Sequence, residues 1–474
     1  MPDILKPDLC IVSAGALGRS LAVAARQRGL ETVLIERENG EACDLPGGTL
    51  HRTTLRAVAA QAQAIRTGAR LGLENALPKL NYKAIAEHAE AVAASAAPQT
   101  SPDRLVALGV TLLEGTPAFT DKNTLSVGQN VLKPAHTILA TGSTPAVPDL
   151  PGLGEIAFFT PDTILSNVRK LTHLLIVGGN ETALELAQIY RRLGSDVTLV
   201  AHGSLLADYD TEGSAILRRH LREEGLAILE NARVKAFLPR SQGIGVSLDD
   251  ADGHIASLDV SHVLIATGIV PDLPWAALEN AGLKRQTSAG TYLQLNEQGR
   301  TSHGRISAFG GAAGEPSYHR SLRQGEQLLD RLSGMPAAAI DGLPRAVATQ
   351  PELAQIGMID GAEASKLGHV VLRSNLGESE AARAVGLAWG SAKIVVDRQG
   401  KILGGTMVGE GAADTIASLA LAMSRNLHAA DLASLPIVGT GNLAVLAELG
   451  GQWVRRQKPS NWSKRRGSLR RLLP

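Results

Sequence analysis

A strand–turn–helix–strand pattern occurs twice in this chain of 474 residues. Each copy has a short apolar run, a glycine-containing turn, a stretch with helical spacing and a second apolar run. This order is typical of a βαβ unit that binds a dinucleotide, and a motif repeated along one chain is more specific than a single copy. The pattern therefore predicts an α/β protein with two Rossmann-like dinucleotide-binding domains.

The first copy lies near the N-terminus. In its turn, Gly15 lets the backbone approach a pyrophosphate, and Gly18 lets the helix pack closely on the strand. The helix N-terminus offers free N–H groups and a positive dipole to the phosphates, and Glu36 can accept hydrogen bonds from an adenosine ribose. Ser13 stands where the pattern has its first glycine, which weakens the match. The expected strand, helix and strand cover residues 9–12, 22–28 and 32–35.

The second copy has its turn at Gly178 and Gly179, followed by Asn180 and Glu181. After its second strand, the chain continues as Ala201-His202. An acid there would bind the free 2′-hydroxyl of NAD, and arginines would bind the 2′-phosphate of NADP. Neither is present, so the sequence leaves the choice between NAD and NADP open. The expected strand, helix and strand cover residues 174–177, 184–193 and 197–200.

Two further apolar runs, residues 138–142 and 264–268, both end in Ala-Thr-Gly and are followed by a proline three residues later. We expect each to be a buried strand. Beyond residue 340 the pattern changes to an α+β domain of the kind that often dimerises. Its expected strands cover residues 346–357, 393–396 and 402–408, and its expected helix covers residues 415–425.

The last 21 residues contain eight Lys or Arg and no acid. We expect a solvated tail, and the alternative is contact with an acidic partner or anionic lipid, aided by Trp453 and Trp462. The net charge of +1 predicts neither nucleic acid nor membrane binding by the whole protein. Two cysteines favour a reducing compartment, and no apolar run approaches the ~20 residues that span a bilayer. These features predict a cytoplasmic protein.

Over nearly its whole length, the chain resembles the pyridine nucleotide–disulfide oxidoreductases, the family of dihydrolipoamide dehydrogenase, glutathione reductase and mercuric reductase. The resemblance rests on both dinucleotide units, both Ala-Thr-Gly segments and residues 306–310, 348–357 and 402–409. It implies that the first unit binds FAD, that the second binds NAD(P)H and that a homodimer completes each active site. The implied domains are FAD-binding over 1–150 and 269–340, NAD(P)-binding over 151–268, dimerisation over 341–452 and a basic tail over 453–474.

The resemblance also assigns site residues. The family's flavin-contacting lysine falls at Arg52, and its ion-pair partner falls at Glu185, so the charges are preserved. A guanidinium is permanently charged and can stabilise a negative reduced flavin. The alternative is a surface pair worth under about 1 kcal/mol. The implied cofactor contacts are Gly15, Gly18, Glu36, Thr141, Gly142 and Gly310 for FAD, and Gly178, Gly179 and Glu181 for NAD(P)H.

The chain departs from the family in its redox and acid–base groups. Cys43 matches one cysteine of the family's C-x4-C pair, but Gly48 stands at the other position. Cys10 falls in a predicted buried strand, where a cysteine usually packs as a small hydrophobe. The family's partner subunit donates a C-terminal His–Glu pair, whereas residues 434–449 contain no histidine here. We therefore expect no disulfide chemistry and interpret Cys43 as a catalytic bystander.

Three functions follow from the sequence. The first is an FAD-dependent NAD(P)H oxidoreductase that passes hydride to a small-molecule acceptor other than a disulfide, such as a quinone, a dye or a second nicotinamide. The second is a degenerate member that binds nucleotides or has a structural role with little turnover. The third, metal-ion reduction through Cys43, is disfavoured because one thiolate holds a soft ion poorly, and we expect no metal site. The degenerate alternative is favoured by weakened nucleotide positions at Ser13, Asn180, Ala201 and Gly311, the last of which replaces an aspartate that binds the ribityl chain in the family.

Overall fold

The structure is a computed structural model. The chain forms two compact units: unit 1 comprises residues 1–69, 74–205 and 222–338, and unit 2 comprises residues 70–73, 206–221 and 339–474. The residues that the structure describes are 4–13, 15–36, 46–74, 76–249, 255–273, 278–286, 291–336, 342–359, 361–378, 380–384, 386, 390–437 and 441–457.

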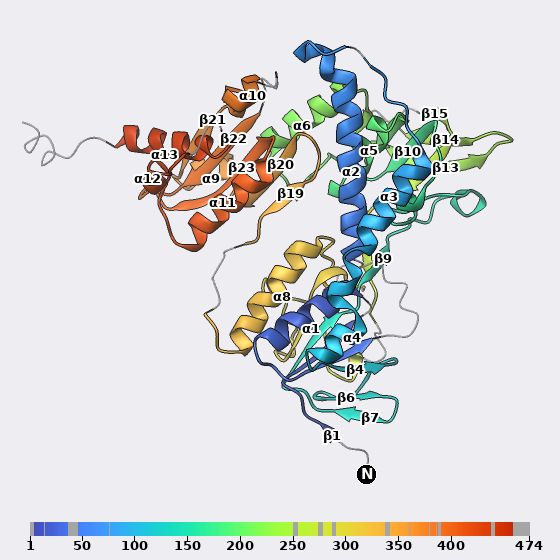
Figure 1. The fold of residues 1–474 in the computed structure, drawn as a ribbon, viewed down its shortest axis with the longest axis vertical. Helices are drawn as coiled ribbons and strands as arrows, with labels where there is room; N and C mark the ends of the chain where they lie inside the picture. The colour runs from blue at the N-terminus through green and yellow to red at the C-terminus, as the bar shows by residue number, and fades with distance from the viewer. Residues whose placement is uncertain are drawn as a thin grey trace, which may run out of the picture. The chain divides into compact units, whose positions relative to one another are not determined.

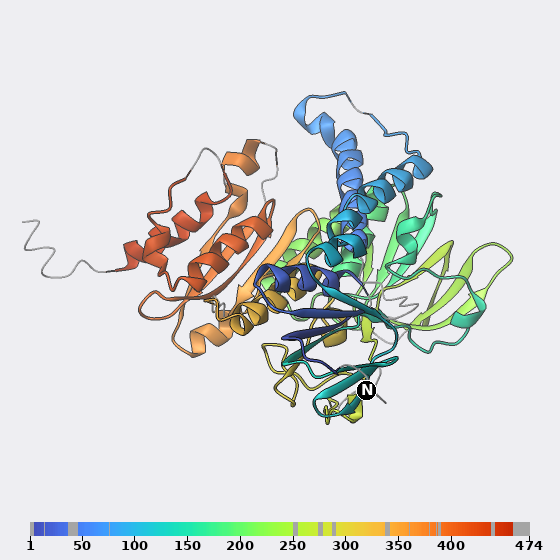
Figure 2. The same ribbon diagram turned by 60° about the horizontal axis from the view of Figure 1, so that its bottom comes forward.

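Unit 1 contains a parallel sheet of five strands, in the order β18 (Ile306–Ala308), β8 (His136–Ala140), β2 (Leu9–Ser13), β3 (Thr32–Glu36) and β4 (Thr111–Glu114). Strands β2 and β8 are buried along their whole length, as expected for a parallel sheet that is covered on both faces. Helices α1 (Ala16–Gln27) and α8 (Tyr318–Leu332) cover one face (Figure 1). The antiparallel strands β5 (Ala118–Asp121), β6 (Thr124–Val127) and β7 (Asn130–Leu132) cover the other (Figure 2).

The strands predicted for the first βαβ unit are confirmed, but its helix is longer than expected. Helix α1 begins at Ala16, whereas apolar spacing placed its start at residue 22. The first turn is buried, with Ala16, Leu17 and Gly18 against the sheet. Small residues at the start of the helix allow this close approach. Because they add little to an apolar repeat, the spacing of apolar residues did not reveal the first turn.

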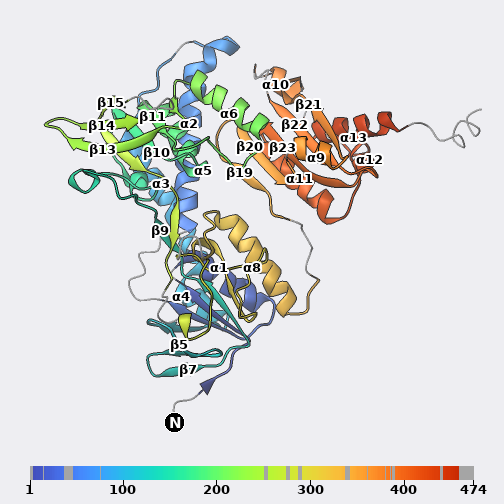
Figure 3. The ribbon, with the colours of Figure 1, turned by 180° about the vertical axis from the view of Figure 1, so that it is seen from behind.

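A second parallel sheet of unit 1 has the order β12 (Ala227–Leu229), β11 (Asp196–Val200), β10 (His173–Val177) and β16 (His262–Ile265). Helix α5 (Glu181–Arg192) packs on β10 and β11, and it begins three residues before its predicted start. The long helix α2 (Pro46–Thr67) packs on α5 and on α3 (Tyr82–Ala94). The face of the sheet that carries Leu175 and Val177 packs against an antiparallel sheet (Figure 3), formed by β13 (Arg233–Pro239), β14 (Ile244–Asp249) and β15 (Ile255–Val260).

A two-stranded antiparallel ribbon joins the segments that follow the two Ala-Thr-Gly motifs. Strand β9 (Ser143–Pro145) pairs with β17 (Ile269–Pro271). The Ala146 N–H donates to Gly268 O at 2.9 Å, and the Asp272 N–H donates to Gly142 O at 3.1 Å. The ribbon therefore holds the ends of the two parallel sheets side by side within unit 1.

Unit 2 contains an antiparallel sheet in the order β19 (Arg345–Val347), β20 (Glu352–Gly357), β23 (Ile402–Gly409), β22 (Ser391–Val396) and β21 (Val370–Ser374). The single strand predicted over residues 346–357 was wrong, because the chain reverses between β19 and β20, where Pro351 cannot donate to a ladder. One face of the sheet packs against α11 (Ala412–Ser424), α12 (Ala429–Leu432) and α13 (Ala444–Arg456).

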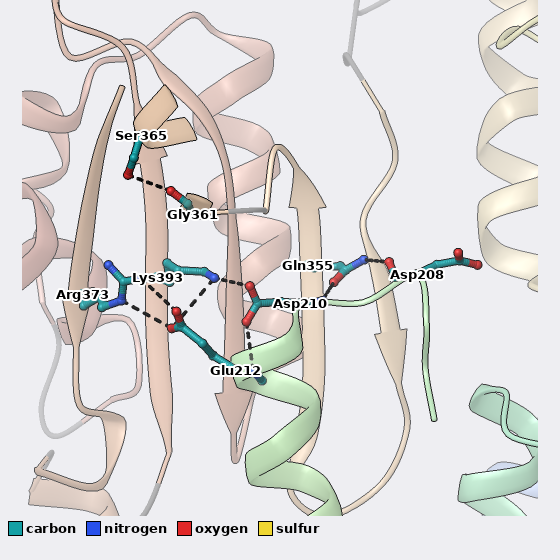
Figure 4. A network of polar contacts seen from close by, with 9 residues as sticks. Asp208, Asp210, Glu212, Gln355, Gly361, Ser365, Arg373 and Lys393 are labelled. Atoms are coloured by element: carbon teal, nitrogen blue, oxygen red, sulfur yellow. Dashed lines mark hydrogen bonds and ion pairs between the residues drawn. The ribbon is translucent and has the colours of Figure 1, made fainter. Parts of the chain in front are cut away.

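Helix α6 (Thr211–Glu223) brings a polar network to the opposite face of this sheet (Figure 4). The Lys393 ammonium on β22 forms an ion pair with Asp210, and the two side chains are 3% and 4% exposed. Asp210 also caps α6, because its Oδ1 accepts from the Gly213 N–H at 2.9 Å. Gln355 accepts from the Asp210 N–H at 3.0 Å and donates to the Asp208 carbonyl at 2.9 Å. These bonds fix the start of α6 to the sheet.

We predict that Lys393→Met destabilises the protein by about 3–5 kcal/mol, because it leaves the buried Asp210 carboxylate without its cation. Urea denaturation followed by circular dichroism measures the loss. Arg373→Met is the matched control, because its pair with Glu212 is 50% and 51% exposed and is worth under about 1 kcal/mol. The double variant with Asp210→Asn keeps an acceptor for the helix cap and should recover most of the stability. An equal loss in both single variants would contradict the prediction.

The structure changes the expected start of the C-terminal tail. Helix α13 extends to Arg456, and Trp453 is buried in the core of unit 2. Trp453 is therefore not available for the membrane contact considered from the sequence. Trp462 and the basic residues from Lys458 onward lie outside the described residues. Within the described part of the chain, no helix is both long and apolar enough to cross a membrane.

Candidate functional site

A cavity of about 380 Å³ lies in unit 1 where the two Ala-Thr-Gly segments meet. The ribbon of β9 and β17 forms part of its wall, and the first turn of α5 and the side chain of Arg52 contribute as well. Parallel α/β sheets bind ligands outside the carboxyl ends of their strands, and this cavity lies at such an edge for β10 and β16. Its polar lining includes Thr49, Arg52, Ser143, Asp162, Asn180, Glu181, Thr267, Tyr292, Glu315 and Tyr318.

The structure brings Arg52 and Glu185 together, as expected from their positions in the sequence. Arg52 Nε on α2 lies 2.9 Å from Glu185 Oε2 on α5, and the two side chains are 27% and 8% exposed. Arg56, which sequence reasoning missed, lies 3.2 Å from the other carboxylate oxygen. Arg56 follows Arg52 by four residues and so lies on the same face of α2. The four-residue spacing from Arg52 could have identified Arg56 as a second partner of Glu185 from the sequence.

The buried Glu185 carboxylate therefore accepts from two guanidinium groups. Removing a cation from a buried pair is costly because the remaining charge is poorly solvated. With Glu185 also held by Arg56, Arg52 reaches the cavity wall from a fixed position. One carboxylate shared by two guanidinium groups leaves an excess positive charge in this cluster of three side chains, of which Arg52 lines the cavity. Such a charge favours a negatively charged bound group.

The turn of the first βαβ unit has the close packing predicted from Gly18. A Cβ at Gly18 would lie 2.2 Å from Ser13 Oγ, so only glycine fits there beside Ser13. Ser13 Oγ donates to Gly15 O at 2.9 Å and accepts from Gly15 N–H at 3.0 Å. Gly15 is the N-cap of α1 and makes no side-chain cap. The serine therefore occupies one N–H that a phosphate could bind, and the N-cap residue, a glycine, has no side chain with which to cap α1.

Glu36 ends β3 beside this turn, at the position predicted for ribose recognition. Its carboxylate forms a two-point ion pair with Arg19, with Nε–Oε1 and Nη2–Oε2 distances of 2.5 and 3.0 Å. A carboxylate has more acceptor sites than one guanidinium uses, so Glu36 keeps the capacity to accept from ribose hydroxyls. Sequence reasoning did not identify Arg19.

Thr141 and Gly311, which lie near the expected FAD site, differ in what they offer to a cofactor. Thr141 Oγ1 is buried and has no hydrogen-bond partner among the described residues, as expected for an atom that a bound group satisfies. At Gly311, which follows Gly310, a Cβ would lie 2.5 Å from Ser143 Oγ and 2.6 Å from the carbonyl carbon of Gly142. Position 311 therefore has no room for the family's aspartate unless the backbone shifts. Thr141 therefore has a hydroxyl with hydrogen-bonding capacity for a bound cofactor, whereas position 311 supplies no carboxylate to the ribityl chain of FAD.

The turn of the second βαβ unit, at Gly178 and Gly179, is closely packed against neighbouring segments. Gly178 has φ +146° and approaches the end of β16, where a Cβ would lie 2.2 Å from Ala266 O. A Cβ at Gly179 would lie 2.9 Å from Ala201 Cβ. Glu181 begins α5 and lines the cavity. The two glycines predicted for this turn are thus required by close contacts.

Asn180 caps α5 at the place where a pyrophosphate would bind. Its Oδ1 accepts from the Ala183 N–H at 2.9 Å, and its Nδ2 donates to Ala266 O at 3.0 Å. A helix N-terminus binds phosphate through its free N–H groups. The asparagine side chain therefore competes with the pyrophosphate for one donor.

We predict that Asn180→Gly tightens NAD(P)H binding by about 3- to 10-fold, because it frees the Ala183 N–H for a charged acceptor. The cost in stability should be a few tenths of a kcal/mol, since glycine is a tolerated N-cap. Asn180→Asp is the matched control, because it keeps the capping acceptor and adds a negative charge that weakens binding. Titration calorimetry measures both affinities. Weaker binding by the glycine variant would contradict the prediction.

The two cysteines differ in what the structure shows. Cys10 lies in β2 and is fully buried, and burial raises the pKa of its thiol to about 12. It remains protonated at neutral pH, and a thiol is a weaker nucleophile and metal ligand than a thiolate. Cys43, predicted as a doubtful catalytic residue, lies outside the described residues. Among the described residues, no group of three or more His, Cys, Asp or Glu side chains is arranged to hold a metal ion.

We predict that native Cys43→Ser protein does not react with a chromogenic disulfide reagent, because the thiol that remains is that of buried Cys10. In urea the same protein should react with one equivalent, which controls for reagent and protein concentration. Absorbance of the released thiolate measures both reactions. Rapid labelling of the native variant would show that Cys10 is accessible.

Comparison with known protein families gives two matches that together cover most of the chain. The pyridine nucleotide-disulphide oxidoreductase model matches residues 7–327, and the dimerisation domain of the same family matches residues 343–437. The first match alone covers more than half of the chain. Members of this family use FAD and NAD(P)H, and the dimerisation domain indicates a homodimer.

Similar curated proteins cover the same length. A mercuric reductase of Streptomyces lividans is 28% identical over 438 residues, which are 90% of this chain and 92% of the relative. Dihydrolipoyl dehydrogenase 2 of Haloarcula marismortui is 28% identical over 440 residues, with the same coverage. Among solved structures, a Cu(II) complex of the HOCl-induced flavoprotein disulfide reductase RclA of Escherichia coli matches with a TM-score of 0.76 at 20% identity, over 94% of this chain and 99% of that one. That structural likeness establishes the fold.

Proposed function

Because this chain belongs to the pyridine nucleotide-disulphide oxidoreductase family, we propose that it is a flavoenzyme that transfers electrons from NAD(P)H to an acceptor other than a disulfide. Bound FAD supplies the chemistry, since it accepts hydride from NAD(P)H and is reoxidised by the acceptor. With a quinone, NAD(P)H and one proton yield NAD(P)+ and the hydroquinone. The protein's own residues bind and orient the two dinucleotides and set the charge around them.

The cavity in unit 1 is the observation that carries the proposal. Its wall combines the N-terminus of α5, which belongs to the second nucleotide unit, with the segment after Gly142, which belongs to the first. Hydride transfer requires two rings held against each other and needs no protein thiol. Arg52 lines the same cavity and is oriented by Glu185, so it supports negative charge on a group bound there.

The residues around the cysteines support an acceptor that is not a disulfide. Gly48 offers no thiol to pair with Cys43, and the thiol of Cys10 is buried and protonated. Residues 434–449 contain no histidine that could act as the family's C-terminal acid–base group. A two-electron acceptor such as a quinone, a dye or a second nicotinamide needs neither a dithiol nor this histidine.

The direct test is the visible spectrum of the purified full-length protein. We expect a flavin spectrum that bleaches when NADH or NADPH is added under anaerobic conditions and returns when a quinone is added. Cys43→Ser should retain quinone reduction, because Cys43 is a bystander in this proposal. A protein that binds no flavin, even after incubation with FAD, would exclude the proposed activity. Loss of quinone reduction in Cys43→Ser would place the thiol in the reaction.

We predict that Arg52→Met slows flavin reduction by about 10-fold or more, because it removes a preorganised charge from the cavity. Arg52→Lys keeps the charge and should retain most of the rate. Arg66→Met is a matched control on the same helix, because the Arg66 guanidinium donates a hydrogen bond to the Arg192 carbonyl. Stopped-flow absorbance gives the rate, and a redox titration should show a lower flavin potential for Arg52→Met alone. An unchanged potential would show that the arginine is structural.

A binding protein with little turnover is the second candidate. It is favoured by three features: the Ser13 hydrogen bond to Gly15, the Asn180 cap on α5 and the lack of room for a side chain at Gly311. Each removes a contact that a dinucleotide could use. This candidate predicts nucleotide binding by calorimetry without bleaching of a bound flavin, so the spectral test separates it from the proposed enzyme.

A further inference from the structure

We propose that the second nucleotide site selects NADP(H) over NAD(H) through a 2′-phosphate contact made by His202 and Arg233. The proposal rests on the dinucleotide role of that site given above and adds which cofactor it takes. Two observations carry it: the absence of an acid at the position that recognises ribose, and an arginine that the fold places beside that position.

Comparison with the first βαβ unit, in which Glu36 is the expected ribose-binding residue, locates the corresponding position of the second unit. In its sheet, Ser13 at the start of the turn pairs with Glu36. In the second sheet, Val177 pairs with Val200, and the register therefore places Ala201 opposite Gly178 at the start of the turn. Ala201 is the counterpart of Glu36. Its methyl group cannot accept from a 2′-hydroxyl, and it does not repel a 2′-phosphate.

The backbone places Arg233 beside this position. The Ala232 N–H donates to Ala201 O at 3.0 Å, and the Asn231 N–H donates to Gly203 O at 3.3 Å. These bonds hold the start of β13 along the end of β11. The Arg233 Nε–H then donates to His202 Nδ1 at 2.9 Å, and both residues are exposed. Arg233 thus lies beside Ala201 and His202, where the adenosine ribose is expected to bind. Its distance along the sequence from the turn gave no indication of this.

The pair presents donors and no acceptor. Because Arg233 donates to Nδ1, the neutral imidazole of His202 carries its proton on Nε2. That N–H and the terminal nitrogens of Arg233 are all donors, which match phosphate oxygens. Neither of these two side chains offers an acceptor for the proton of a ribose hydroxyl. The geometry therefore suits a dianionic 2′-phosphate better than the hydroxyl of NAD.

Two carboxylates lie near this pair in the described part of the chain, and each already has another partner. Glu230 accepts from the Leu205 N–H at 2.9 Å and lies 3.7 Å from Arg222, and its side chain is 11% exposed. Asp249, which is opposite Arg233 in the β-sheet register, pairs with Lys235 at 3.2 Å. Both acids are thus engaged with protein cations or backbone.

Calorimetric titration of the purified full-length protein with NADP+ and with NAD+ tests the preference directly. A charge-assisted contact corresponds to about a 10- to 100-fold difference in affinity, so we expect NADP+ to bind that much more tightly. The preference should fall as the salt concentration rises, because the contact is exposed and is screened. Equal affinities, or tighter binding of NAD+, would overturn the proposal.

Substitutions assign the preference to these side chains. Arg233→Met should lower the affinity for NADP+ by about 10-fold or more and leave that for NAD+ unchanged. Arg240→Met is the matched control, because this arginine flanks the other end of β13, where it pairs with Asp259 at 2.7 Å. His202→Glu, at an exposed position, should reverse the preference by repelling the phosphate and accepting from the hydroxyl. Retained NADP+ preference in both Arg233→Met and His202→Glu would refute the assignment.

Different results would refute the proposed enzyme activity and the proposed preference for NADP(H). Equal bleaching of the flavin by NADH and NADPH, with equal affinities, would refute the cofactor preference and support the proposed enzyme. Tight NADP+ binding that depends on Arg233, in a protein whose flavin is absent or does not bleach, would support the 2′-phosphate site and refute the enzyme.

Discussion

The pairing of β9 with β17 is the constraint on which the candidate site depends. Each strand has three residues and follows an Ala-Thr-Gly segment, so the ribbon ties the end of β8 to the end of β16. The Thr267 hydroxyl adds a bond to the Ala146 carbonyl. Because parallel sheets bind ligands at these ends, joining them creates one cavity with contributions from both nucleotide units. Without the ribbon, the ends of the two parallel sheets would not be held together to line one cavity.

Arg52 contributes a positive charge to the wall of this cavity, and its position is set by its ion pair with Glu185. This ion pair requires α2 to pack on α5, so that the arginine of one helix meets the glutamate of the other. The carboxylate is buried, and Arg56 holds its second oxygen. A buried acid with a single partner would be costly if that partner moved, whereas two partners keep it compensated. The position of Arg52 therefore depends on helix packing as well as on its own ion pair.

The sequence predicted both parallel sheets, because buried strands and glycine turns leave a local pattern. It also located Arg52 beside Glu185, through a resemblance. It could not predict the contacts that join distant segments, such as Lys393 with Asp210, because a lysine on a strand is usually placed in solvent. The ribbon was missed as well, since three-residue strands containing proline have almost no periodicity. The same limit concealed Arg233, which reaches the end of β11 through backbone bonds of the β12–β13 connection.

The substitutions at the two turns have a common physical effect. Ser13 and Asn180 replace glycines of the pattern, and each bonds a backbone N–H that would otherwise face phosphate. In the first βαβ unit, Glu36 and the Thr141 hydroxyl, which has no hydrogen-bond partner among the described residues, could still contact the cofactor elsewhere. In the second, the proposed contact of Arg233 and His202 is with the adenosine ribose, away from the pyrophosphate beside Asn180. Affinity would then come mainly from the adenosine end, while the pyrophosphate contact is weakened. A cofactor that must leave after each turnover tolerates this distribution, because its release requires only moderate total affinity.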